Sequence, residues 1–138
     1  MTGRQPRFRL VPYIMPSGRL PVQDFIESLS KNDPDAYVRF QDLIRPLVEE
    51  LGPSMGMPHF RHLPPTDFSE IRWDGIGHGH HRIYCTIENE GRILLLHAVT
   101  KRWPKFNRGD KRICRNRYND YLSGNYDVQK RLRLRSRT

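Results

Sequence analysis

The chain contains little cysteine and no long apolar run. Its two cysteines, Cys85 and Cys114, form neither a CxxC motif nor a disulfide framework, which favours a reducing compartment. No apolar run approaches the roughly 20 residues that span a bilayer, so we expect no membrane partner. The first residues lack the apolar core of a signal peptide. Together these absences favour a cytoplasmic protein.

Acidic residues are scarce toward the C-terminal end. Residues 1–100 carry 11 Lys and Arg against 12 Asp and Glu, whereas residues 101–138 carry 13 against 3. The net charge of +9 therefore comes from the last part of the chain. Such a block indicates a polyanionic partner, most simply nucleic acid, and its alternative is a solvated helix followed by a disordered tail.

Apolar spacing predicts two N-terminal helices. The first begins at Pro21, and its apolar stripe is Val22, Phe25, Ile26 and Leu29. The second has Asp33 as N-cap and Pro34 at its first position. Its apolar stripe is Tyr37, Phe40, Ile44, Leu47 and Leu51. Pro46 removes a backbone donor inside this helix, so we expect a kink or break there.

Alternating side chains predict four or five strands. Residues 7–14 read as an edge strand because they contain Pro12, and residues 59–63 as a short strand. Three stronger strands follow at residues 67–73, 81–88 and 91–101. The last is apolar on both faces from residue 93 to 96, as in a central strand that is covered on both sides.

A final helix is predicted to start near Asn107, with Asp110 as its capping partner. Its inner face would hold Cys114, Tyr118, Tyr121 and Leu122. We therefore expect an α+β fold, with two N-terminal helices packed on one face of a mostly antiparallel sheet and a C-terminal helix. The second face would be partly uncovered. Residues 1–122 would form the domain, and residues 123–138 a mobile basic tail.

One face of this sheet is predicted to gather cations. Arg72 and Arg82 lie on adjacent strands with the same facing, and Tyr84 follows Arg82 on that face. The end of the last strand adds Lys101, Arg102 and Lys105. Such a group suits a phosphodiester, because these cations neutralise phosphate oxygens and developing negative charge. The alternative is that the sheet arginines only pair with Glu70 and Glu88.

The stretch "GIGHGHHRIYC" (residues 75–85) concentrates three histidines, His78, His80 and His81. A metal site needs converging ligands, and only Asp74 lies beside them in sequence, so we expect no metal. The histidines either lie exposed without a role or contact RNA and transfer protons, since histidine titrates near neutral pH. The loop would deliver Arg82 to the sheet face. His97, in the apolar strand, is expected to be a hydrogen-bonded core histidine.

The segment after the last strand interleaves aromatic and basic residues. Trp103 and Phe106 either stack on unpaired bases or anchor the final helix, and anchoring is favoured for Phe106. The residues predicted to contact RNA are His80, Tyr84, Trp103, Lys105, Arg108, Lys111, Arg112 and Arg115.

Several segments, in this order, resemble one family. "FSEIRW", "HRIYCTI" and "RILLLHAVTKRWPKF", preceded by "GRLPVQDFIESL" and "LGPSMGMPHFRHL" and followed by "RNRYNDYL", are similar to the RelE/ParE toxin superfamily in its HigB-like, phage-derived branch. The likeness covers residues 7–122. It implies a RelE-like fold and a ribosome-dependent endoribonuclease that cuts mRNA in the A site without a cofactor. It also implies a cognate helix-turn-helix antitoxin as partner.

The resemblance implies catalytic roles for five residues. Arg82 matches the strand arginine used on the scissile phosphate, Arg72 the basic residue on the preceding strand, and Lys101 with Arg102 the basic pair after the last strand. HigB-like enzymes tend to use a histidine here, which makes His80 or His81 the acid or base for attack of the 2′-hydroxyl on phosphorus. The chain departs from the family in "KRWPKF", in "GHGHH" and in its Arg-rich tail.

Two other functions stay open at this stage. A ParE-like inhibitor of DNA gyrase would share the fold but act by binding alone. A nucleic-acid-binding phage protein without catalysis would bind tightly and salt-sensitively and cleave nothing. The basic tail suggests added affinity for ribosomal RNA, or docking in an acidic groove of an antitoxin.

Overall fold

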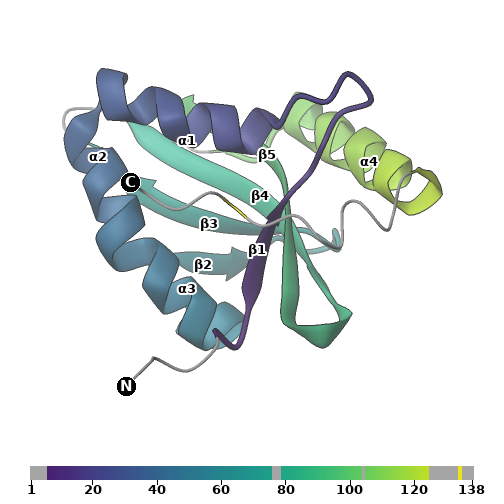
Figure 1. Cartoon of the computed structure of the whole chain (residues 1–138), viewed down its shortest axis with the longest axis horizontal. Helices are drawn as coiled ribbons and strands as arrows, with labels where there is room; N and C mark the ends of the chain where they lie inside the picture. Colours follow the sequence, from purple (N-terminus) through teal and green to yellow (C-terminus); the bar gives the residue numbers. More distant parts are fainter. Residues whose placement is uncertain (1–5, 76–78, 104, 125–133, 135–138) are drawn as a thin grey trace.

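Five strands form one sheet that carries helices on both faces (Figure 1). The computed structural model describes residues 6–75, 79–103, 105–124 and 134. Its elements, in chain order, are β1 (Arg9–Pro12), α1 (Pro21–Asn32), α2 (Pro34–Arg39), a π-helical segment (Phe40–Ile44), α3 (Arg45–Leu51), a 3₁₀ turn (Gly52–Met55), β2 (Phe60–His62), β3 (Ser69–Asp74), β4 (His80–Glu88), a second 3₁₀ turn (Asn89–Gly91), β5 (Arg92–Lys101) and α4 (Arg108–Ser123).

The sheet has the order β1-β5-β4-β3-β2, with β1 parallel to β5 and every other pair antiparallel. This confirms the predicted α+β class and is compatible with a RelE-like fold. It also confirms that the strand with Pro12 lies at an edge. In β5, Ile93 and Leu95 join one core, and Leu94 and Leu96 join the other, as a central strand covered on both sides requires.

Helices α1 to α3 cover one face of the sheet. The predicted caps are confirmed, since Pro21 opens α1 and the Asp33 side chain accepts a hydrogen bond from Ala36 N at 3.2 Å. The break expected at Pro46 takes the form of a π-helical segment. Proline has no N–H, so the Asp42 carbonyl lacks its α-helical donor. One residue earlier, Arg45 N bonds to Phe40 O, five residues back, and not to the Gln41 carbonyl.

The π-helical segment changes which side chains of these helices are buried. The predicted stripe included Leu47 and Leu51, but Leu51 is exposed and Leu47 only half-buried. Phe40 and Ile44 of the predicted stripe are confirmed as buried, and Ala36 and Val48 are the other buried apolar positions. The extra residue in a π turn delays the return to the same face, so the stripe advances in steps of four.

The second face of the sheet, predicted to be partly uncovered, is covered in part by α4. Cys114 and Tyr121 of α4 pack in a second core, together with strand residues that point away from α1–α3, such as Leu94 and Leu96. Figure 1 shows α4 apart from α1–α3. The predicted capping pair of Asn107 and Asp110 is confirmed as a reciprocal capping box. The predicted inner-face residue Leu122 is exposed, because it lies about 100° around the helix from the buried Tyr121.

The predicted basic tail lies largely outside the described residues. Leu134, its one described residue beyond Gly124, is 1% exposed in the core beneath α1–α3. Its N–H donates to Leu10 O at 2.8 Å, and its carbonyl accepts from Arg45 Nη2 at 2.7 Å. At this position the tail is anchored to β1.

None of the helices within the described part of the chain is both long enough and apolar enough to cross a bilayer.

Candidate active site

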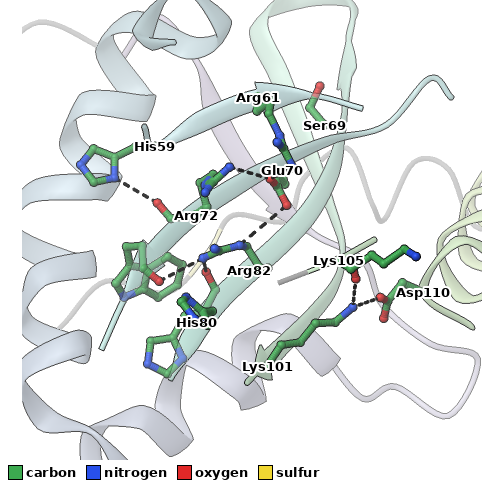
Figure 2. Close-up of polar contacts among 12 residues, drawn as sticks. His59, Arg61, Ser69, Glu70, Arg72, His80, Arg82, Lys101, Lys105 and Asp110 are labelled. Atoms are coloured by element: carbon green, nitrogen blue, oxygen red, sulfur yellow. Dashed lines mark hydrogen bonds and ion pairs between the residues drawn. The ribbon is translucent and has the colours of Figure 1, made fainter. Parts of the chain in front are cut away.

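Polar side chains from β3 and β4 share the sheet face on which α4 packs. Arg72 pairs with Arg82 and Asp74 with His80, so these four side chains point to the same side of the sheet. Figure 2 shows Arg72, Arg82 and His80. The predicted common facing of Arg72 and Arg82 is therefore confirmed. The strand alternation that predicted it also places Glu70 among them.

Glu70 is the centre of this group. Its buried carboxylate lies 2.9 Å from Arg61 Nη2, 3.4 Å from Arg72 Nη1 and 3.9 Å from Arg82 Nε. The sheet arginines therefore do pair with Glu70, as the alternative reading of the sequence expected. Three cations on one carboxylate still leave an excess of positive charge. Arg61 was missed in the sequence because β2 is only three residues long and shows no clear alternation.

Arg82 lies beneath the surface of this group. Its side chain is 2% exposed, whereas Arg72 is 22% and Arg61 43% exposed. Its Nη1 donates to the His81 carbonyl at 2.8 Å and to the Trp73 carbonyl at 3.3 Å. Burial, followed by the charge of Arg72, lowers the pKa of Arg82. Arg82 is therefore held in one orientation, and Arg61 and Arg72 present charge to solvent.

His80 and Asp74 form a pair beside Arg82. His80 Nδ1 lies 2.8 Å from Asp74 Oδ1, and Arg82 Nη1 lies 3.6 Å from the same oxygen. Burial opposes ionisation of Asp74, but the hydrogen bond and charge of His80 and the charge of Arg82 outweigh it and lower the pKa of this carboxyl. An ionised Asp74 orients the imidazole through Nδ1 and leaves Nε2 available for a ligand.

His81 lies on the opposite sheet face, under α1. It is almost fully buried, its Nδ1 lies 2.8 Å from Thr100 Oγ1, and its Nε2 lies 2.9 Å from Asp33 Oδ2. Both ring nitrogens thus already have partners. The His81 imidazole and the Arg82 guanidinium therefore lie on opposite faces of the sheet.

Gly75 belongs to the same contact. A Cβ there would overlap the Asp33 carboxylate, so the histidine-rich stretch must begin with glycine. Because Asp33 also caps α2, Gly75 and His81 pack against the start of that helix.

Lys101 points away from Arg82 in Figure 2. Its ammonium binds the Asp110 carboxylate and the Lys105 carbonyl, and it lies 5.8 Å from the centre of the Tyr84 ring. Asp110 also binds His97 Nε2 at 3.0 Å, which confirms His97 as a hydrogen-bonded core residue. Burial lowers the pKa of His97 despite the carboxylate.

Of the remaining residues predicted to contact RNA, some are buried and others are exposed to solvent. Tyr84 is fully buried, and burial, followed by the charges of Asp110 and Glu70, raises the pKa of its hydroxyl. Phe106 lies 4.6 Å from the Tyr84 ring, which confirms it as an anchor of α4. Trp103 is 78% exposed. The exposed cations are Arg102, Lys105, Arg108, Lys111, Arg112 and Arg115.

No cluster of three or more His, Cys, Asp or Glu that could hold a metal ion occurs in the described ranges, and His78 lies outside them. We call the sheet face that carries Arg61, Glu70, Arg72, Asp74, His80 and Arg82 the polar face; it offers cations, carboxylates and an imidazole. Such a set can bind a phosphate and move a proton.

A known protein family matches most of the chain. The model of the family described as phage derived protein Gp49-like matches residues 25–119, a span from α1 into α4 that includes the whole polar face. No curated protein matches the chain.

Proposed function

Because the chain belongs to the phage-derived Gp49-like proteins, a family of RelE- and HigB-like toxins, we propose that it is a ribosome-dependent mRNA endoribonuclease. It would act as the toxin of a type II toxin–antitoxin pair. A helix-turn-helix antitoxin would be its cognate partner. The observation that carries this proposal is the pairing of His80 with Asp74 beside three arginines on one sheet face.

The arginines support binding of a scissile phosphate. Arg72 and Arg61 are half-exposed to exposed, and a guanidinium can bind phosphate oxygens through two parallel hydrogen bonds. Their charge would stabilise the extra negative charge of the pentavalent transition state. Arg82 would act as a positioning residue, because it is buried and holds Asp74 and Glu70 in place.

His80 supports the proton transfer. With Nδ1 bound to Asp74, Nε2 would accept the proton of the RNA 2′-hydroxyl as that oxygen attacks the adjacent phosphorus. The P–O5′ bond would break, leaving a 2′,3′-cyclic phosphate, and water would protonate the 5′ oxygen. His80 takes this role in the proposal rather than His81, which is buried under α1.

The basic pair after β5 has unequal parts in this scheme. Arg102 is exposed and would add a phosphate contact, whereas Lys101 would first have to leave Asp110. The exposed cations of α4 and of the segment before it suit the ribosomal RNA around the A site. Trp103, being exposed, would stack on an unpaired base.

The test is primer extension on cellular mRNA after short induction of the wild-type chain or of His80→Ala. Cuts within translated reading frames that vanish in the variant support the proposal and place His80 in the reaction. Intact mRNA with arrested growth would favour gyrase inhibition by binding. Intact mRNA with normal growth would overturn the proposal that the chain is a toxin.

A further inference from the structure

A pocket of about 310 Å³ opens between the end of β2 and the beginning of α4. It is lined by Arg61, His62, Leu63, Pro64, Phe106 and Lys111. Ligand pockets typically measure roughly 300–1,000 Å³, so this one is near the lower limit. It suits a single small ligand group and not a folded partner.

The lining combines positive charge with apolar surface. Arg61 and Lys111 are exposed cations, His62 can donate a hydrogen bond, and none of the six lining residues is acidic. A guanidinium carries five donors, so Arg61 can remain bound to Glu70 and still bind an anion. The pocket is therefore electrostatically suited to a phosphate.

The apolar wall suits a flat ring. Phe106 is only half-buried, and its ring is fixed by its contact with Tyr84 at 4.6 Å and by an edge contact with Phe68 at 6.4 Å. Lys111 Nζ lies 5.8 Å from the centre of the same ring. A rigid aromatic ring beside cations is the arrangement on which unpaired bases stack in single-stranded RNA complexes.

We propose that this pocket binds one unpaired nucleotide of the RNA substrate, with its base against Phe106 and its phosphate on Lys111 and Arg61. The proposal rests on the proposed function, which it extends by a site that selects the base. Arg61 lies two strands from His80, roughly 10 Å across the sheet, and is level with Tyr84, which adds roughly 13 Å along the strand. The bound nucleotide would therefore flank the scissile phosphate and not carry it.

The test uses the full chain and short 2′-O-methyl oligo(A), oligo(U) and oligo(C) with a fluorescent label, which the enzyme cannot cleave by 2′ attack. Affinity is measured by anisotropy over a range of salt concentrations. Lys111→Gln is expected to weaken binding about tenfold and to lower the salt slope by about one phosphate contact. Phe106→Leu is expected to reduce the differences in affinity among the three bases.

Two further variants separate the pocket from general charge. Arg112→Gln removes the same charge from α4 outside the pocket, and it is expected to weaken binding evenly for all three bases. Lys31→Gln, at the exposed end of α1, is expected to leave the affinity unchanged. If Lys111→Gln behaves like Lys31→Gln, or if Phe106→Leu leaves the base preference intact, the pocket does not bind a nucleotide.

Cleavage on ribosomes, measured in parallel, keeps the two proposals apart. A wild-type chain that cleaves while Lys111→Gln and Phe106→Leu keep its efficiency and cut sites overturns the pocket and leaves the nuclease standing. A wild-type chain that binds the oligonucleotides through the pocket but never cleaves overturns the nuclease and leaves the pocket standing. Binding of an acidic peptide that the oligonucleotides do not displace would assign the pocket to a protein partner.

Discussion

His80 Nδ1 lies 2.8 Å from Asp74 Oδ1, where paired residues at the ends of β3 and β4 bring the two side chains to the same sheet face. One nitrogen of the imidazole is thereby assigned to the carboxylate, and the other is directed outward. Partial burial raises the pKa of the Asp74 carboxyl, but the hydrogen bond and charge of His80, followed by the charge of Arg82 at 3.6 Å from the same oxygen, outweigh it and lower this pKa. The pair has the geometry of a base oriented by an acid, on the face that carries the arginines.

Replacing His80 with Ala is expected to reduce mRNA cleavage on ribosomes by about 10²–10⁴-fold, the usual contribution of general acid–base catalysis. Single-turnover rates at saturating enzyme measure this loss without the binding step. Because His80 is partly exposed, the melting temperature should change little. A variant that keeps the wild-type rate would remove His80 from the reaction and return the question to the other groups of this face.

Replacing Asp74 with Asn is expected to lower stability in a pH-dependent way. The pKa of Asp74 is lowered in the folded protein, so ionised Asp74 stabilises the fold above the unfolded value and this stabilisation is lost as the pH falls through the folded pKa. The difference in melting temperature between wild type and variant should therefore be present near neutral pH and shrink below about pH 4. A difference that is constant from neutral to strongly acidic pH would contradict the ionic role.

Replacing Glu70 with Gln is expected to lower the free energy of unfolding by about 3–5 kcal/mol, because the buried Arg82 would lose its buried carboxylate partner and keep only the exposed Asp74. Urea denaturation measures the change. Arg61→Gln is the matched control, since it breaks the exposed side of the same group and should cost under about 1 kcal/mol. Equal losses for the two variants would show that burial does not govern this network.

Much of the fold could be predicted because it follows from local patterns. Strand alternation placed Arg72 and Arg82 on one face, and capping chemistry located Asn107 at the start of α4. The apolar run of β5 predicts cover on both faces, but it does not say which helix covers the second face. In the structure α4 does so, because Cys114 and Tyr121 join Leu94 and Leu96 in one core.

The sequence predicted which residues lie at the candidate site, but not which of their side chains are buried. Alternation separates His80 from His81, yet the hydrogen bonds of His81 to Asp33 and Thr100 arise only from tertiary contact. Likewise, the pairing of Lys101 with Asp110 depends on how the chain turns between β5 and α4. Charge in a sequence therefore located the basic face, whereas the structure decides which cations reach solvent.

Replacing Tyr84 with Phe is expected to raise the free energy of unfolding by about 1–3 kcal/mol. The Tyr84 hydroxyl is buried and has no hydrogen-bond partner among the described residues, and an unsatisfied buried hydroxyl costs about that much. The ring contact with Phe106 would be kept. Thermal and urea denaturation both report the change, and a clear loss of stability would mean that the hydroxyl is hydrogen-bonded in solution.

Replacing Leu134 with Ala is expected to lower the free energy of unfolding by about 2–5 kcal/mol, the usual cost of truncating a buried leucine. Leu134 is 1% exposed, its N–H donates to the Leu10 carbonyl, and its carbonyl accepts from the Arg45 side chain. The matched control is Leu122→Ala on the exposed side of α4, which should cost little. Urea denaturation compares the two. Equal small losses would mean that the tail does not contribute to the core, and that its basic residues act independently of the fold.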